Sequence, residues 1–335
     1  LWNMGRQLKA AGVKRVEGGI VVDQSYFDEN NLPFAYDQQK NEDSAFRAPV
    51  GGVSLNRNTL AITIRPGLQS MAPASLFLDP PGYAVLINDT VTMEGGANNP
   101  KISATAYENR TRIRVWGQVQ LGHRPVTYYR RVDNPSLLAG HAVKQVLTSL
   151  GISVGGGVQT GPLPPGTPNL AEHRSAPLSN LLYEAGKVSN NFVAETVLKT
   201  IGAESGKTAG TWERAIAQAG RILAAWGLAE NSYVYRNGSG LFDANRFSAG
   251  QFTNILRAVY LDSRIRPEFL SHLAIGGIDG TIKSRYQKAT VRGVVRAKTG
   301  TLDDVSAISG YVFNASGDRP IAFSVVLNNA SGYIS

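Results

Sequence analysis

A stretch rich in glycine and proline divides this 335-residue chain into two parts with different patterns. It begins at Gly155-Gly156-Gly157 and continues through Gly161-Pro162-Leu163-Pro164-Pro165-Gly166. Such a run extends neither a helix nor a strand, because glycine leaves the backbone unconstrained and proline lacks an amide hydrogen. We therefore place a domain boundary near residue 160.

The part before this boundary is typical of mostly β structure with a few helices. Thr59 to Arg65 and Arg112 to Leu121 alternate apolar and polar side chains, as half-buried strands do. Arg15 to Asp23 is apolar enough for a further strand. Leu1 to about Ala11 has the pattern of an amphipathic helix. A second helix is expected from Asn134-Pro135, a capping residue followed by proline at the first helical position, to Gly151.

The part after the boundary is typical of helices followed by strands. We expect helices from Ser189 to about Ile201, with Val193, Val197, Leu198 and Ile201 on one side, from Thr211 to Trp226, and from Ser248, where Gln251 completes a capping box. The strands that follow are expected over Val291 to Lys298, Val305 to Phe313 and Pro320 to Leu327. This order favours an α+β fold in which helices pack against an antiparallel sheet.

The composition argues against several classes of protein. The net charge is +9, but the basic residues are scattered, so we expect a solvated surface that favours an anionic partner such as a cell-wall polymer or a membrane surface, and no nucleic acid. The absence of cysteine excludes disulfides and thiolate sites. The four histidines lack metal-ligand spacing, so we expect no metal and no cofactor. No apolar run approaches the ~20 residues of a transmembrane helix.

The first candidate motif is Lys298-Thr299-Gly300, at the end of an expected strand. A lysine there supplies positive charge, a threonine hydroxyl can hold a substrate carboxylate, and glycine lets a substrate lie along the strand. This combination suits acyl transfer. Taken alone the tripeptide is common, and a structural role explains it better.

The second candidate motif is Ser189-Asn190-Asn191, at the start of an expected helix. Serine and asparagine are ordinary helix caps, so this motif alone also has a structural explanation. In an acyl-transfer site, the Ser189 hydroxyl would shuttle a proton and the Asn191 amide would orient the substrate.

The two motifs are more specific together than apart. Ser-x-Asn and Lys-Thr-Gly are typical of class A β-lactamases and penicillin-binding proteins. Over nearly its whole length the chain resembles the class C penicillin-binding proteins, the D-alanyl-D-alanine carboxypeptidase/endopeptidase family (peptidase family S13). Further stretches that carry the resemblance are Gly18 to Phe27, Asn56-Arg57-Asn58, Ser175 to Leu178, Gly210-Thr211-Trp212, Asn237-Gly238-Ser239-Gly240-Leu241 and Gly277-Ile278-Asp279-Gly280-Thr281.

The resemblance implies a fold and a set of domains. Residues 1–160 would form two inserted accessory domains of mostly β structure, one nested in the other. Residues 161–335 would form the C-terminal part of a serine transpeptidase-like domain of the penicillin-binding and β-lactamase type. The protein would act in the periplasm or elsewhere outside the cytoplasm, and association with a membrane is a further expectation.

The resemblance also implies roles for individual residues in cleavage of peptidoglycan stem peptides that end in D-Ala-D-Ala. Ser189 would pass a proton to the leaving amine, Lys298 would sustain that hydrogen-bond network, and Asn191 would orient the substrate amide. The substrate-binding residues would be Thr299, which holds the terminal carboxylate, Gly300, Thr301, whose N–H joins the oxyanion hole, Ser239, and Asp23, which recognises an amino group of the stem peptide. Asp23 is explained equally well as a turn residue after a strand.

The nucleophile of such an enzyme is missing from this chain, because no lysine has a serine three residues before it. The family's Ser-x-x-Lys lies upstream of the accessory domains, and we expect it upstream of Leu1, which falls inside a helix. The chain alone should therefore be inactive, while β-lactams should trap the serine of the full-length parent. The alternative is a non-catalytic peptidoglycan-binding protein on the same fold; a class A β-lactamase is weaker still, because it lacks so long an insertion between its first two motifs.

Overall fold

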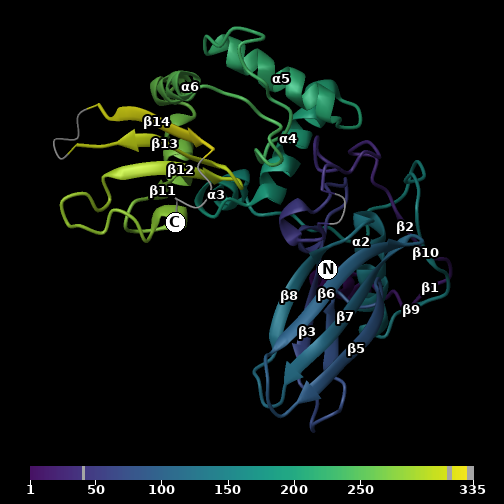
Figure 1. Cartoon of the computed structure of the whole chain (residues 1–335). Coiled ribbons are helices and arrows are strands. Elements are labelled where there is room, and N and C mark those ends of the chain that lie inside the picture. The colour runs from purple at the N-terminus through teal and green to yellow at the C-terminus, as the bar shows by residue number, and fades with distance from the viewer. Residues whose placement is uncertain (40–41, 315–318, 330–335) are drawn as a thin grey trace. The chain divides into compact units, whose positions relative to one another are not determined.

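The computed structural model describes residues 1–39, 42–314 and 319–329, which form two compact units (Figure 1). The first unit contains Leu1–Leu32 and Gln39–Ser175. The second contains Pro33–Gln38 and the chain from Ala176 onward. The division therefore falls after Ser175 and not near residue 160, and a short early segment belongs to the second unit.

One layer of the first unit consists of helices and short parallel strand pairs. Strand β1 (Arg15–Val16) pairs with β9 (Ser153–Val154), and β2 (Ile20–Val22) pairs with β10 (Val158–Thr160). Helix α2 (Pro135–Ser149) packs on β2 and β10, and helix α1 (Trp2–Ala10) packs on α2. Gly140 permits this packing, because a Cβ there would lie 2.4 Å from a methyl of Val158. The single strand expected over Arg15 to Asp23 was wrong, since Glu17-Gly18-Gly19 interrupts it.

The remaining strands of the first unit form two three-stranded sheets. One has the order β4-β3-β8, with β3 (Thr59–Arg65) antiparallel to β4 (Ser75–Asp79) and β8 (Val126–Arg131). The other has the order β5-β7-β6, with β7 (Arg110–Gln120) parallel to β5 (Val85–Met93) and antiparallel to β6 (Asn99–Tyr107). Both sheets share a buried core with the start of α2, formed by Leu60, Ile62, Ile64, Ile113, Val115, Val119, Leu137 and Leu138. The expected strand alternation and the helix capped by Asn134 are confirmed.

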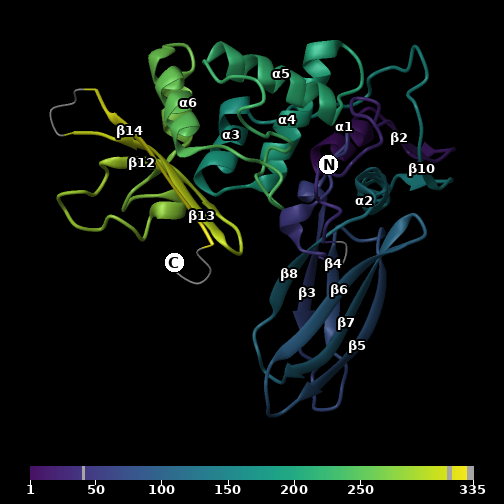
Figure 2. The same cartoon turned by 45° about the horizontal axis from the view of Figure 1, so that its top comes forward.

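The second unit packs helices against an antiparallel sheet with the order β11-β12-β13-β14 (Figure 2). Its strands are β11 (Ala274–Ile275), β12 (Val295–Thr301), β13 (Val305–Val312) and β14 (Ile321–Asn328). Its helices are α3 (Leu178–Lys187), α4 (Asn191–Gly206), α5 (Trp212–Ala225), α6 (Ala249–Leu261) and α7 (Arg266–His272). Helix α6 covers β13 and β14 through a core that contains Leu256 and Tyr311. The predicted α+β class is confirmed.

Local details differ from the sequence-based predictions in two places. Strand β12 begins at Val295, because the residues from Val291 onward form a turn, and it continues through Thr301. Helix α4 begins at Asn191, and of the four apolar residues expected on its buried side only Leu198 is fully buried. The buried face also contains Glu195 and Lys199, so it is charged as well as apolar.

Candidate functional site

The Lys298-Thr299-Gly300 motif lies on a strand with one free edge. Strand β11 pairs with β12 only at Arg296 and Ala297, while β13 pairs with β12 along its full length. Within the described ranges, no strand pairs with residues 298–301 on the β11 side. The backbone of this segment can therefore accept an extended peptide as an additional strand, with Gly300 leaving room for it.

Lys298 and Ser189 meet although they are 109 residues apart in the chain. The Lys298 ammonium donates a hydrogen bond of 2.6 Å to the Ser189 hydroxyl and another of 2.6 Å to the carbonyl of Thr299. Burial lowers the pKa of Lys298 to about 8. An amine with this pKa can change its protonation state near neutral pH, as a proton-transfer group must.

A strained turn presents the Ser189 hydroxyl to Lys298. Ser189 lies between α3 and α4 with a φ of 60°, in the left-handed region that non-glycine residues rarely adopt. The adjacent Asn190 caps α4, since its side-chain oxygen accepts from the N–H of Val193 at 3.2 Å. Its amide nitrogen donates to Glu184 at 3.2 Å. The cap is therefore Asn190 and not Ser189, and Asn191 is the first helical residue.

A buried ion pair fixes the same turn to a second loop. The side chain of Lys187 is 4% exposed, and its ammonium lies 2.7 and 2.9 Å from the two carboxylate oxygens of Asp279. Asp279 also accepts from the N–H of Ile275 at 2.7 Å. Two residues after Asp279, the hydroxyl of Thr281 accepts a hydrogen bond of 2.8 Å from the hydroxyl of Thr299. The ion pair thus links the turn that contains Ser189, the partner of Lys298, to the loop that contains Thr281, the partner of Thr299.

Ser239 belongs to another hydrogen-bonded loop of the second unit. Its hydroxyl accepts from the hydroxyl of Tyr36 at 3.1 Å, and its N–H donates to Glu195 at 2.8 Å. Glu195 is fully buried and also accepts from the N–H of Gly238 at 3.0 Å. Burial raises the pKa of this carboxyl, although hydrogen bonds from Ser239 and Gly238 oppose the shift.

Asp23 lies in the first unit, at the end of β2. Its carboxylate accepts from the N–H of Ser25 at 2.8 Å and from the N–H of Leu163 at 2.7 Å. Hydrogen bonds hold the pKa of Asp23 below its usual value; the one from the Ser25 hydroxyl has the largest effect, and those from the two N–H groups add to it. Asp23 therefore joins strand β2 to the glycine- and proline-rich segment, and its role toward a substrate amine stays a prediction.

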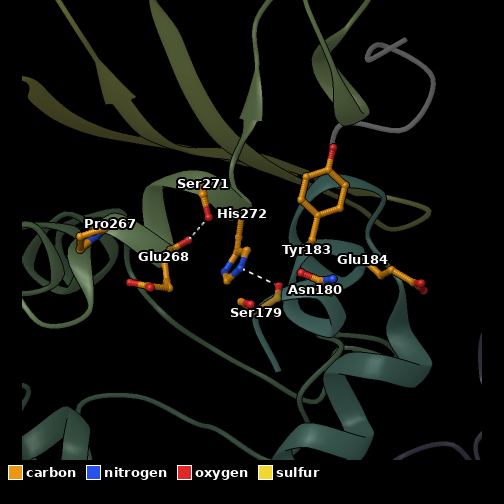
Figure 3. A pocket seen from close by; sticks show the side chains of 8 residues that line it. All are labelled: Ser179, Asn180, Tyr183, Glu184, Pro267, Glu268, Ser271 and His272. Atoms are coloured by element: carbon orange, nitrogen blue, oxygen red, sulfur yellow. Dashed lines mark hydrogen bonds between the residues drawn. The ribbon is translucent and has the colours of Figure 1, made fainter. Parts of the chain in front are cut away.

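A pocket of about 710 Å³ opens between α3 and α7 (Figure 3). The His272 ring nitrogen lies 3.0 Å from the carbonyl of Ser179, and two acidic residues, Glu184 and Glu268, line the pocket. Neither Lys298 nor Thr299 lines it. One of its lining residues, Glu184, accepts a hydrogen bond from the side chain of Asn190.

Sequence reasoning missed part of this arrangement. Thr281 and Asp279 lie in the Gly277 to Thr281 stretch, which carried the family resemblance without an assigned role. Lys187 lies two residues before the second motif. The signal that could have found them was their position within recognised stretches, whereas nothing in the sequence indicated that Tyr36 would reach Ser239.

Comparisons with known proteins identify the family to which the chain is similar. The model of the peptidase S13 family, described as D-Ala-D-Ala carboxypeptidase 3, matches residues 1–334. The D-alanyl-D-alanine carboxypeptidase of Actinomadura sp. (strain R39) is 33% identical over 347 residues, which cover 98% of this chain and 63% of that protein. The D-alanyl-D-alanine carboxypeptidase DacB of Haemophilus influenzae is 23% identical over 336 residues, covering 99% of this chain and 69% of that protein.

Solved structures show the same fold. The crystal structure of penicillin binding protein 4 from Haemophilus influenzae matches with a TM-score of 0.83 at 22% identity, covering 99% of this chain and 73% of that chain. A second structure of that protein, complexed with a novel β-lactam, has a TM-score of 0.76. Among the described residues, no helix is both long and apolar enough to cross a bilayer.

Proposed function

This chain belongs to the peptidase S13 family of D-Ala-D-Ala carboxypeptidases, and from that premise we propose that it is the substrate-binding part of a serine D-Ala-D-Ala carboxypeptidase/endopeptidase. The substrates would be peptidoglycan stem peptides and cross-links that end in D-Ala-D-Ala. The observation that carries the proposal is the 2.6 Å hydrogen bond between Lys298 and Ser189 beside a free strand edge.

This geometry and the family support the following catalytic roles. A nucleophilic serine attacks the carbonyl of the penultimate D-alanine, and the terminal D-alanine leaves as an amine. That amine needs a proton, and the Ser189 hydroxyl can deliver one because Lys298, with its pKa of about 8, donates to it. Asn191 orients the substrate amide. Water then hydrolyses the acyl-enzyme.

The substrate would lie along the free edge of β12. Thr299 would hold the terminal carboxylate, with Thr281 fixing its hydroxyl at 2.8 Å. The N–H of Thr301 would contribute to the oxyanion hole. Ser239 and Asp23 are proposed to contact the rest of the stem peptide, Ser239 in the second unit and Asp23 in the first.

We propose that the first unit corresponds to the two inserted accessory domains, and that the second is the C-terminal part of the transpeptidase-like domain. The protein would work outside the cytoplasm, where peptidoglycan and β-lactams are met, and its association with a membrane is part of this proposal. No metal or other cofactor takes part.

The chain itself should not be acylated, because it contains no Ser-x-x-Lys. Incubation with a fluorescent penicillin should leave it unlabelled on a denaturing gel, while the full-length parent should be labelled. Labelling of this chain would contradict the missing nucleophile. In the parent, Lys298→Ala should abolish acylation, and undiminished labelling would refute the role of Lys298.

The alternative is a non-catalytic peptidoglycan-binding protein on the same fold. It predicts that the parent also lacks Ser-x-x-Lys and binds stem peptides without cleaving them. Sequencing the gene ahead of Leu1 and measuring release of D-alanine distinguish the two proposals.

A further inference from the structure

A polar cavity of about 760 Å³ opens within the first unit, and none of the residues considered above as catalytic lines it. Its volume lies within the range of small-molecule sites, about 300–1,000 Å³. Three parts of the unit form its walls: one face of α2, the β6–β7 turn, and β10 with the preceding glycine. The lining residues that the argument uses are Glu108, Asn109, Arg110, His141, Lys144 and Gln145.

Basic groups converge on this cavity from two elements. Arg110 is the first residue of β7, and His141 and Lys144 lie on the same face of α2. Burial is the larger cause that lowers the pKa of His141, and the charges of Arg110 and Lys144 lower it further. The positive potential of both cations therefore reaches the imidazole. Glu108 is the acidic residue that lines the cavity, so the cations outnumber it.

Most of these groups have capacity left for a ligand. The Lys144 ammonium donates one hydrogen bond, of 2.6 Å, to the carbonyl of Gly156, and an ammonium has three donors. In the part of the chain that the structure describes, the side chains of Arg110 and Gln145 form no hydrogen bond with the protein. A guanidinium presents a planar fork of donors that fits the two oxygens of a phosphate or a carboxylate.

The neutral lining of the cavity suits hydroxyl groups. The amides of Asn109, Gln145 and Gln159 and the hydroxyl group of Thr160 supply both donors and acceptors. The hydroxyl group of Thr148 supplies an acceptor, because it donates to the carbonyl of Lys144 at 2.9 Å. Sugar hydroxyls need such mixed partners, whereas a lone inorganic anion needs donors alone.

We propose that this cavity binds an anionic sugar, one that carries a phosphate or a carboxylate. Arg110 and Lys144 contact the anionic group, His141 lies beside it, and the amides and hydroxyl groups contact the sugar. The site is separate from the proposed peptidase chemistry, so either proposal can fail without the other. Cell-wall glycans and their phosphorylated precursors have this chemistry.

The test is calorimetric titration of this chain at low salt with four probes: glucose 1-phosphate, glucuronate, glucose and inorganic phosphate. We expect both anionic sugars to bind, glucose not to bind, and inorganic phosphate to bind more weakly than glucose 1-phosphate. Binding of only one anionic sugar would identify the preferred anion. Binding of glucose as tight as that of the anionic sugars, or no binding of either anionic sugar, would overturn the proposal.

Matched variants assign the binding to the cavity. Arg110→Gln should weaken binding about tenfold, as loss of a charge-assisted contact does, and Glu108→Gln should strengthen it a few-fold by removing a like charge. Arg114→Gln is the control, because Arg114 lies on the same strand but pairs with Asp89 at 2.7 Å. A gain of affinity in Glu108→Gln cannot come from misfolding. Equal affinity in Arg110→Gln and Arg114→Gln would refute the site.

Proton linkage gives a second readout. An anion beside His141 should raise the pKa of its imidazole, so binding of glucuronate, whose carboxylate stays ionised in this range, should tighten as the pH falls from 7.5 to 5.5. The other titratable groups around His141 are Tyr83, whose ring lies 6.1 Å away, Glu108, Arg110 and Lys144. An NMR titration in which saturating glucose 1-phosphate leaves the pKa of His141 unchanged would contradict contact with the anion.

Discussion

Replacing Asp279 with asparagine should destabilise the second unit more than replacing its partner Lys187 with methionine. The substitution nearly preserves the shape of the side chain but removes its charge. Lys187 then keeps its ammonium in a site where its side chain is 4% exposed, and loses the carboxylate that lies at 2.7 and 2.9 Å. An asparagine oxygen can still accept one hydrogen bond, so the charge is poorly compensated but not isolated.

The magnitude follows from which charge stays buried. Removing one partner of a buried ion pair costs about 3–5 kcal/mol, because the other charge remains unpaired. For Asp279→Asn the retained hydrogen bond places the loss of unfolding free energy near the lower end, about 3 kcal/mol. For Lys187→Met the remaining Asp279 is 30% exposed and still accepts from Ile275, so the loss should be smaller, about 1–2 kcal/mol.

The assay is urea unfolding followed by circular dichroism, with Lys288→Met as the control at an exposed lysine of the same unit. Two compact units can unfold in separate steps, so each transition is fitted on its own. We expect the order Asp279→Asn, Lys187→Met, Lys288→Met, from the largest to the smallest loss. The reasoning is refuted if Asp279→Asn costs no more than Lys187→Met, or if both behave like the control.

Two further predictions concern the pH dependence of thermal stability. Burial raises the pKa of Glu195, so the folded state holds this proton more tightly and the group's contribution to stability is lost as the pH rises through the raised pKa. The difference in Tm between Glu195→Gln and wild type should therefore shift in favour of the variant from pH 4 to 8; a constant difference would contradict the raised pKa. Burial lowers the pKa of Lys298 to about 8, so the unfolded state holds that proton more tightly, and wild-type stability should rise with pH above about 8 relative to Lys298→Met. A pH-independent difference between these two melting temperatures would show that the pKa of Lys298 is not lowered.

Elements with strong local signals could be predicted from the sequence. Strand β3 follows its alternating pattern because one face packs into the core, where Leu60, Ile62 and Ile64 are at most 2% exposed. Helix α6 begins at the predicted capping box, in which Ser248 and Gln251 bond each other's backbone. Such signals involve neighbouring residues and need no tertiary partner.

Features that depend on distant partners could not be predicted. The buried face of α4 contains Glu195 because the N–H groups of Gly238 and Ser239 satisfy its carboxylate. Periodicity counts a glutamate as exposed, since it does not register a partner 43 residues away. The division after Ser175 depends in the same way on distant contacts, because Leu163 donates to Asp23 and Glu172 exchanges hydrogen bonds with Gln7.

The candidate site lies between these two cases. The motif residues Ser189 and Lys298 were predicted as a pair from the family resemblance, and the structure places them in hydrogen-bond contact. The positive φ of Ser189 and the link from Thr299 to Thr281 are products of tertiary packing. No local pattern of residue types encodes them.

The early segment Pro33–Gln38 of the second unit affects how the protein can be made. Phe34 accepts from the side chain of Asn237, and Tyr36 donates to Ser239, in each case across 203 residues. At a synthesis rate of about 5–20 residues per second, the ribosome delivers those partners roughly 10–40 seconds later. Maturation of this unit therefore waits for late translation, and a fragment started at Ala176 would leave the fully buried amide of Asn237 without its Phe34 acceptor.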